Sequence, residues 1–333
     1  SLKFFHVSDV HLDPFYNKAA DVSTYCQGSG LTADYEAPYG RIGCDSPLAL
    51  WKIALLGMKE EGQSAEFMML SGDSSAHGLT DDHGSPKVLK AMSMVASEAH
   101  KTFQFFLQLA TMTSLDIIFY QTIAIGGKMI LLVLNTMYWN NNWYTNDLVK
   151  QIAETQMQWF KDQLQLAKDQ KKRVLIMSHI PPGGDPHDGS YFWHKQYLIP
   201  YASLTAGQFH DVVAGQFYGH THRNDFHLQI MNTASDEAEK TSTKSFVLQV
   251  ASVSPVYSNN PTFRVMSLDT RERALVDYDQ YYLDLVLVTE FAHPVWKFDS
   301  TFSRKYPSKH KLINADRIDE LNRKLISQTE GRY

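Results

Sequence analysis

Near its start the chain reads Phe4-Phe5-His6-Val7-Ser8-Asp9-Val10-His11. The first part, Phe4–Ser8, is an apolar, β-prone run, so two metal-ligand residue types, Asp9 and His11, directly follow an expected strand. The same order recurs at Gly72-Asp73, with His77 shortly after it, at Ser178-His179 and at Gly219-His220-Thr221-His222. In α/β sheets, ligands gather beyond the carboxyl ends of the strands, so these segments are expected to meet at one site.

Strands and helices alternate over the first two thirds of the chain. Helical periodicity is present at Pro47–Glu61, Lys87–Leu109 and Asn146–Lys168, and strand-like apolar runs lie at Phe67–Leu70, Met129–Leu134, Arg173–Met177 and Val212–Tyr218. This alternation predicts an α/β fold with a parallel or mixed sheet covered by helices.

The pattern changes after His222. Strand-like runs separated by short turns follow at Phe226–Met231, Ser245–Ser252, Thr262–Leu268 and Tyr278–Thr289. Short turns favour antiparallel pairing, so we expect a second, more antiparallel sheet. A polar amphipathic helix is expected over Ala315–Gln328.

The composition excludes several classes of protein. The chain has 333 residues, 44% of them hydrophobic, which suits one large α/β domain with a small appended piece. Its net charge of -5 leaves no basic excess to neutralise phosphates, so no nucleic-acid polymer is expected as a partner. The longest apolar runs, such as Met129–Leu134, are too short for stable membrane insertion. Ser1 lies almost directly before the first strand, as in a mature or trimmed chain.

The two cysteines, Cys26 and Cys44, bracket a loop rich in Gly, Tyr and Ser. If they are paired, the bridge would stabilise the fold by roughly 3 kcal/mol. If they are not, they are two free thiols in a cytosolic protein. The spacing alone favours neither interpretation.

The mixture of imidazole and carboxylate ligands suits Zn, Mn or Fe. Asp9 and His11 are two residues apart, so both side chains can face one ion from an extended strand end, and His220 and His222 share that spacing. Asp73 has two carboxylate oxygens and can bridge two ions about 3.5–4 Å apart. Such a pair of ions lowers the pKa of a shared water, and the resulting hydroxide attacks a phosphorus atom in line.

Longer motifs carry a resemblance to a known family. They are Asp9–Pro14, Gly43–Pro47, Asn135–Trp139, His179–Gly183 and Ser254–Val265. With these motifs the chain, from Ser1 to about Leu268, resembles the calcineurin-like metallophosphoesterase superfamily and, more narrowly, the acid sphingomyelinase-like phosphodiesterases. The resemblance implies a central β-sandwich of two mixed sheets flanked by helices in four layers. It implies a catalytic domain over 1–270 and a small C-terminal helical subdomain over 271–333.

The same resemblance implies a site and a setting. It implies two zinc ions, the first held by Asp9, His11, Asp73 and His222 and the second by Asp73, His179 and His220. His77 matches a family histidine that contacts the phosphate or the leaving group. A loop histidine beside two cations can also donate a proton to a departing alkoxide, although it could instead cap the following helix. The resemblance favours a Cys26–Cys44 disulfide and a secreted, extracellular or lysosomal (or vacuolar) enzyme, which we expect to be a monomer.

Aromatic residues near the ligand segments are candidates for substrate contacts. They are Tyr138, Trp139, Trp143, Tyr191, Phe192, Trp193 and Tyr257. Such rings can stack on a base or enclose a choline cation, and the alternative for each is packing in the core or a loop. We take Tyr257 and Tyr138 as the substrate-binding candidates.

One family feature is missing from the sequence. The superfamily carries a Gly-Asn-His segment whose asparagine completes the second metal site and whose histidine acts as general acid. This chain has no asparagine between Asn17 and Asn135. Either residues of the natural protein are missing between about Phe103 and Gly126, which we favour, or the protein lacks the segment and is degenerate. In both cases we expect the second metal site to be incomplete.

Three functions compete. The first is a zinc-dependent phosphodiesterase acting on a nucleotide-type or phosphocholine-type diester, or alternatively on sphingomyelin or another phospholipid. Only eight residues precede Asp9, so we expect no saposin-like domain there and favour soluble substrates. The second is a phosphomonoesterase, and Ala76 argues against its purple acid phosphatase branch, which needs a tyrosine there. The third is a non-catalytic binding protein, supported only by the missing segment.

Overall fold

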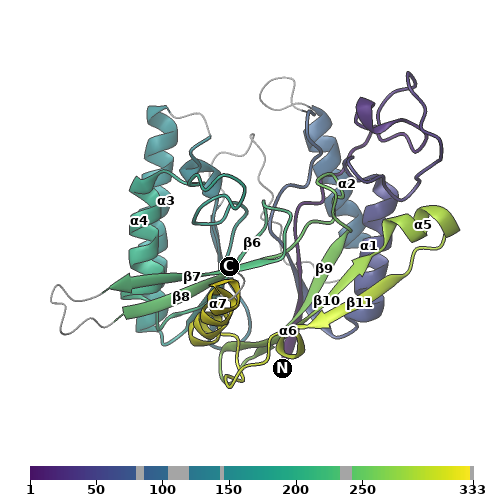
Figure 1. The fold of residues 1–333 in the computed structure, drawn as a ribbon. Helices are drawn as coiled ribbons and strands as arrows, with labels where there is room; N and C mark the ends of the chain where they lie inside the picture. The colour runs from purple at the N-terminus through teal and green to yellow at the C-terminus, as the bar shows by residue number, and fades with distance from the viewer. Residues whose placement is uncertain (80–85, 104–119, 143–145, 233–241, 331–333) are drawn as a thin grey trace.

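A computed structural model describes residues 1–79, 86–103, 120–142, 146–232 and 242–330. Two β-sheets lie at the centre with helices on both outer sides (Figure 1). The helices are α1 (Leu48–Glu61), α2 (Pro86–Thr102), α3 (Asp147–Asp169), α4 (Lys195–Ala202), α5 (Leu285–Phe291), α6 (Phe302–Lys305) and α7 (Ala315–Glu330). Within the described residues, no helix is both long and apolar enough to cross a bilayer.

The two sheets are both mixed. The first has the strand order β11-β10-β9-β1-β2, and the second has the order β3-β4-β5-β6-β8-β7. Their bounds are β1 (Leu2–Val7), β2 (Ala65–Leu70), β3 (Gln121–Ala124), β4 (Met129–Val133), β5 (Arg173–Met177), β6 (Val213–Tyr218), β7 (Asp225–Asn232), β8 (Ser242–Gln249), β9 (Thr262–Asp269), β10 (Ala274–Leu283) and β11 (Trp296–Thr301). The predicted class, α/β with two mixed sheets flanked by helices, is confirmed.

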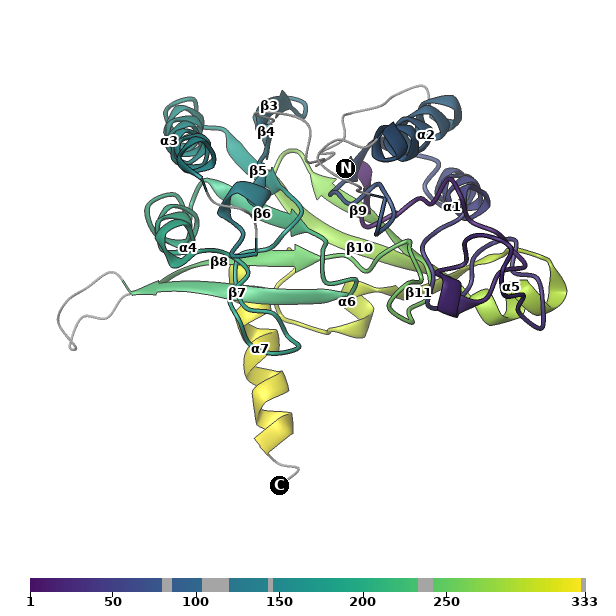
Figure 2. The ribbon, with the colours of Figure 1, turned by 90° about the horizontal axis from the view of Figure 1, so that it is seen from above.

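Alternation along the central strands explains the four layers. In β1, Phe4 lies in the core between the sheets, where its ring meets Phe217 of β6 edge-on at 5.7 Å, while Phe5 points to the core under α1 and α2. In β4, Leu131 faces the inter-sheet core and Leu132 faces the core under α3 and α4. Both faces of these strands are largely buried, so apolar side chains occupy both faces. Figure 2 shows the helices on either side of the paired sheets.

The expected division of strands between the sheets is wrong. We expected the strands after His222 to form a separate sheet, but β8 lies parallel to β6 and joins the sheet of β4 and β5. The strands β9, β10 and β11 instead extend the sheet of β1, which pairs antiparallel with β9 and parallel with β2. Periodicity identifies a strand but not its partner, and partner choice depends on contacts distant in sequence.

The run Tyr278–Thr289 is also not a single strand. β10 ends at Leu283, and the carboxylate of Asp284 accepts a hydrogen bond of 3.2 Å from the Leu287 amide at the start of α5. An aspartate before an apolar run is a typical N-cap, and this signal was missed.

The division into 1–270 and 271–333 stays a prediction. β10 and β11 share a sheet with β1, and α7 packs on β7 and β8.

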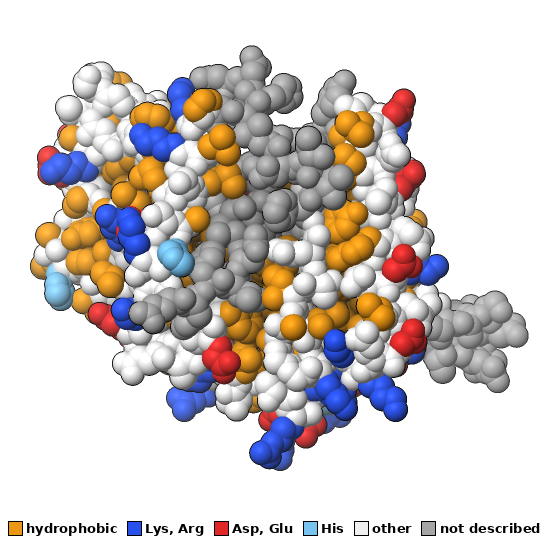
Figure 3. Space-filling model, turned by 180° about the vertical axis from the view of Figure 1, so that it is seen from behind, with side chains coloured by type: hydrophobic (Ala, Val, Ile, Leu, Met, Phe, Trp, Pro, Cys, Tyr) orange, Lys and Arg blue, Asp and Glu red, His pale blue; other side chains and the backbone are white. Residues whose placement is uncertain are grey.

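On the face seen in Figure 3, Lys and Arg side chains lie among Asp and Glu along the lower edge, so the surface there is of mixed charge.

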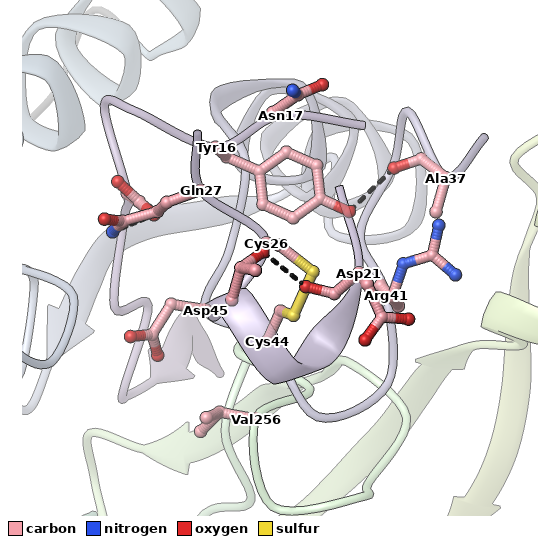
Figure 4. Close-up of a disulfide and its surroundings, with 12 residues drawn as sticks. Tyr16, Asn17, Asp21, Cys26, Gln27, Ala37, Arg41, Cys44, Asp45 and Val256 are labelled. Carbon is pink, nitrogen blue, oxygen red and sulfur yellow. Dashed lines mark hydrogen bonds between the residues drawn. A yellow bond between two sulfur atoms is a disulfide. The ribbon is translucent and has the colours of Figure 1, made fainter. Parts of the chain in front are cut away.

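Cys26 and Cys44 form a disulfide, as the resemblance predicted (Figure 4). Both side chains are buried, and around them the loop between Asp13 and Pro47 is held by backbone hydrogen bonds more than by regular structure. The bridge closes a loop with a sequence separation of 18.

We expect the double variant Cys26→Ser/Cys44→Ser to lose about 3 kcal/mol in free energy of unfolding, because the unfolded chain gains freedom when the loop is open. Urea unfolding of the two proteins without reductant measures the difference. Wild-type protein in reductant should unfold like the variant, and equal midpoints for all three samples would contradict the prediction.

Candidate metal centre

The first predicted ligand group is assembled by the ends of β1 and β6. Asp9 and His11 follow β1, and His222 follows β6, so the two sheets each contribute to the group. The Nε2 atoms of His11 and His222 lie 3.1 Å apart, and Asp9 Oδ1 lies 3.3 Å from His222 Nε2 and 3.7 Å from His11 Nε2. All three side chains are buried. Three ligand atoms thus converge on one point.

The second predicted group also draws on both sheets. Asp73 follows β2, while His179 and His220 follow β5 and β6. Asp73 Oδ2 lies 2.9 Å from His179 Nε2 and 3.6 Å from His11 Nε2. The Asp73 carboxylate therefore lies between the two groups, which is the position required of a bridging ligand. The structure brings all six predicted metal ligands together.

The backbone at these residues is unusual. Five of the six have a positive φ, with values of 52° at Asp9, 42° at His11, 45° at Asp73, 75° at His220 and 57° at His222. Only a few per cent of non-glycine residues adopt this region, and such residues cluster at functional sites because the surrounding structure must enforce them. The turns after the strands are thus shaped to aim these side chains.

Two glycines allow the close approach of the ligand loops. A Cβ on Gly219 would lie 1.8 Å from Ser8 Oγ and 2.4 Å from Asp9 Oδ2, and a Cβ on Gly72 would lie 2.6 Å from the Nδ1 atom of His179. Gly72 also has a φ of +118°, which favours glycine. The glycine before Asp73 is therefore required by space as well as by conformation, and the glycine before His220 is required by space.

Hydrogen bonds orient the imidazoles. His179 Nδ1 lies 2.9 Å from the carbonyl oxygen of Ser71, and His11 Nδ1 lies 3.1 Å from that of Ser75. A protonated Nδ1 donates to each carbonyl and leaves the Nε2 lone pair directed into the site, an arrangement typical of metal-binding histidines. His179 Nε2 is buried and has no well-aligned hydrogen-bond partner among the described residues. The donor set of two carboxylates and four imidazoles therefore fits a pair of transition-metal ions.

Charged groups in this cluster shift one another's pKa values. Burial alone would raise the pKa of Asp9, but the charges of His179 and His222 hold that pKa well below its usual range. Burial likewise opposes ionisation of Asp73, yet His179 lowers its pKa. Burial would lower the pKa of His179, but Asp73 and Asp9 raise it to about 9. Burial, joined by the charge of His179, lowers the pKa of His220 to about 4. Both carboxylates are therefore ionised and ready to bind a cation.

His77 lies at the edge of the cluster. Its ring stacks on His11 with centroids 4.2 Å apart, and its Nε2 atom lies 3.3 Å from the Tyr257 hydroxyl. Its backbone N–H and its Nδ1 atom both face the carboxylate of Asp45, at 2.8 Å and 3.0 Å. The catalytic role of His77 stays a prediction. Asp45 belongs to the motif Gly43–Pro47, but it was not predicted as a site residue, because its position 32 residues from His77 carries no periodic signal.

The candidate aromatic residues separate into two groups. Trp139 and Trp193 are fully buried, and they and the partly buried Tyr138 pack in the core under α3 and α4. Phe192 is also buried and meets His220 edge-on at 5.1 Å, whereas Tyr257 is 62% exposed and its ring lies 4.6 Å from that of His222. Tyr191 is exposed as well, with the Lys195 ammonium over its ring. Trp143 lies outside the described residues, as does most of the stretch in which a Gly-Asn-His segment was sought.

Sequence comparison relates the chain to named phosphodiesterases. No protein-family model matches it. It is 28% identical over 343 residues to the human protein named cyclic GMP-AMP phosphodiesterase SMPDL3A, covering 91% of this chain and 75% of that protein. It is 24% identical to human acid sphingomyelinase-like phosphodiesterase 3b, covering 91% of this chain and 76% of that protein. It is 23% identical to sphingomyelinase phosphodiesterase D of Dictyostelium discoideum, covering 98% and 85%.

Structural comparison gives a weaker likeness. A dimetal phosphatase from Danio rerio aligns with a TM-score of 0.48 and 13% identity, covering 90% of this chain and 99% of that chain. The sequence relatives are hydrolases of phosphodiesters by name. The resemblance seen in the motifs is therefore confirmed, and the chain is a homologue of the acid sphingomyelinase-like phosphodiesterases.

Proposed function

We propose that this protein is a zinc-dependent phosphodiesterase that hydrolyses a P–O bond of a nucleotide-type or phosphocholine-type diester. The observation that carries the proposal is the position of Asp73, whose Oδ2 lies 3.6 Å from His11 Nε2 of one ligand group and 2.9 Å from His179 Nε2 of the other. A carboxylate shared by two such groups is typical of two-metal hydrolytic sites. The names of the relatives support the reaction class.

The position of each residue indicates which ion it would hold. Asp9, His11 and His222 would hold one ion, His179 and His220 the other, and Asp73 both. Bound there, the two ions supply an activated water and neutralise charge on the phosphoryl oxygens. His77, whose ring stacks on that of His11, would donate a proton to a leaving group bound beside this site.

Tyr257 supports the choice of substrate class. Its ring is largely exposed next to His77 and His222, so a planar base or a choline cation can contact its face. Tyr138 remains a weaker candidate because it packs on the core. A lipid diester is the second candidate substrate, since two Dictyostelium relatives are named for sphingomyelin cleavage. The disulfide supports a secreted or lysosomal location. A monomeric state stays a prediction.

The test uses the purified full chain, stripped with a chelator and then supplied with zinc, manganese or iron. Bis-p-nitrophenyl phosphate, p-nitrophenyl phosphate, a cyclic dinucleotide, glycerophosphocholine and sphingomyelin vesicles are compared as substrates. We expect zinc-restored hydrolysis of diesters with little monoester cleavage. Metal binding without turnover of any substrate would favour the non-catalytic alternative, and preferential monoester cleavage would overturn the reaction class.

Zinc affinity should rise with pH. In the metal-free protein Asp73 and Asp9 raise the pKa of His179 to about 9, so a proton must leave this imidazole before it can bind an ion. Below that pKa the apparent affinity therefore increases roughly tenfold per pH unit for each proton released. His220, whose pKa is lowered to about 4, is already neutral and adds nothing to this slope.

Competition with a chelating dye, from about pH 6 to about pH 8, measures this slope. The variant His179→Gln should bind zinc more weakly but with a shallower dependence on pH. A wild-type affinity that does not change with pH would contradict the protonation state assigned to His179.

A further inference from the structure

The carboxylate of Asp45 contacts His77 at two places. One oxygen accepts a hydrogen bond of 2.8 Å from the backbone N–H of His77, and the other lies 3.0 Å from the ring nitrogen Nδ1. The two residues are 32 positions apart, so this contact is built by the fold and not by a local turn. A loop cap would need only the backbone bond. The bond to the ring restricts the rotation of the imidazole as well.

Asp45 itself is held firmly. Cys44 before it is fixed by the disulfide, and Figure 4 shows the carboxylate of Asp45 pointing away from the sulfur atoms. Ser46 after it donates its backbone N–H to the His11 carbonyl at 3.0 Å and accepts from the Asp13 amide at 2.8 Å. The residue is therefore attached on one side to a covalent bridge and on the other to the loop that carries two metal ligands.

Burial differs sharply between the two partners. The side chain of Asp45 is 10% exposed, while that of His77 is 46% exposed at the mouth of the site. Besides His77, the Ser254 hydroxyl lies 3.4 Å from the Asp45 carboxylate. A mostly buried carboxylate that orients a partly exposed imidazole leaves the opposite ring nitrogen, Nε2, facing outward, and here it faces the hydroxyl of Tyr257 at 3.3 Å.

We propose that Asp45 is a positioning residue for His77. Its carboxylate keeps a proton on Nδ1 in both the neutral and the cationic ring and holds the ring parallel to His11, so that Nε2, which carries the donated proton in the cationic form, points at the place where a leaving-group oxygen would replace the Tyr257 hydroxyl. This inference rests on the proposed phosphodiesterase function. It extends the site to the loop between Asp13 and Pro47, which contains the disulfide and to which none of the metal ligands belongs.

The kinetic test is a double-mutant cycle in the zinc-loaded full chain, with Asp45→Asn, His77→Ala and the double variant. The substrates are bis-p-nitrophenyl phosphate and thymidylyl-(3′→5′)-thymidine, whose alkoxide is a poor leaving group. We expect Asp45→Asn to lower kcat on the dinucleotide about 10- to 100-fold with little change in KM, as for other orienting partners. In the His77→Ala background the same substitution should have no further effect.

The control is Asp21→Asn, which lies in the same loop between Asp13 and Pro47 and whose carboxylate accepts hydrogen bonds from the backbone N–H and the hydroxyl of Ser23. It should match wild-type protein in kcat, zinc content and unfolding midpoint. An equal loss from Asp45→Asn with and without His77 would overturn the proposal, because Asp45 would then act independently of the imidazole. Unchanged kcat in Asp45→Asn would overturn it as well.

A second measurement does not require the variant to fold. Long-range ¹H–¹⁵N spectra of the wild-type protein, with His77 identified by its loss in His77→Gln, report which ring nitrogen carries the proton when the ring is neutral. The expected signature is the Nδ1–H tautomer, and an Nε2–H tautomer would overturn the proposal. If wild-type protein cleaves no diester, the proposed function fails, whereas the tautomer still tests the Asp45–His77 contact separately.

Discussion

Replacing Asp73 by asparagine should lower zinc-dependent phosphodiesterase activity by at least about a thousandfold, since metal ions contribute several kcal/mol to such reactions. The Asp73 carboxylate lies between the two ligand groups. Its Oδ2 atom is 3.6 Å from His11 Nε2 and 2.9 Å from His179 Nε2. An amide offers one neutral oxygen in place of two that share a negative charge. Asp73→Asn therefore removes the bridge without changing the size of the side chain.

Activity on bis-p-nitrophenyl phosphate and zinc content by elemental analysis are measured together. Zinc content should fall with activity, because the remaining three-residue groups lose their shared ligand. Asp162→Asn is the matched control, since Asp162 lies on the exposed face of α3 and its carboxylate accepts a hydrogen bond from the Gln158 side chain. Full zinc content with wild-type turnover in Asp73→Asn would show that Asp73 does not bridge.

Gly219→Ala should destabilise the protein by at least about 3 kcal/mol or prevent its folding, at the upper end of the usual cost of overpacking. The new methyl group would lie 1.8 Å from Ser8 Oγ, 2.4 Å from Asp9 Oδ2 and 2.7 Å from Ser8 Cβ. Rotation of the hydroxyl alone cannot relieve all three contacts. The loop must move, and the hydrogen bonds of 3.1–3.2 Å from the His220 amide to the Asp9 carboxylate are then lost.

Chemical unfolding and zinc affinity of Gly219→Ala test this prediction. The control is Gly30→Ala, because a Cβ on Gly30 meets no atom within 4 Å and its backbone is not in the positive-φ region. We expect the control to be neutral or slightly stabilised. Wild-type stability and zinc binding in Gly219→Ala would mean that β1 and β6 do not approach each other as closely as described.

The sequence predicted individual elements better than their assembly. Arg173–Met177 was predicted with the bounds that β5 has, because a short apolar run between polar residues identifies a buried strand. The pairing of β1 with β9 was not predicted, because it joins Leu2 to Leu268 and nothing local specifies it. The short helix α5 was read as strand, since seven mostly apolar residues show no clear helical period.

The site could be predicted further than the sheet order. Each metal ligand stands at the end of an apolar run, so its place follows from the strand alone. The orientation of the ligands could not be predicted, because it depends on positive φ values and on carbonyl partners such as Ser71 and Ser75. Asp45 was missed for a related reason. Its partner His77 is brought to it by the packing of two loops, and the sequence between them carries no sign of the contact.

The contribution of both sheets to each ligand group has a consequence for the order in which the protein matures. Asp9 and His222 approach within 3.3 Å although 213 positions of the chain separate them, and they belong to different sheets. No partly folded species with only one sheet formed can present either complete group, and contacts of such long range form late and slowly. High-affinity zinc uptake should therefore follow docking of the sheets. Bound metal then stabilises the docked sheets and slows their separation.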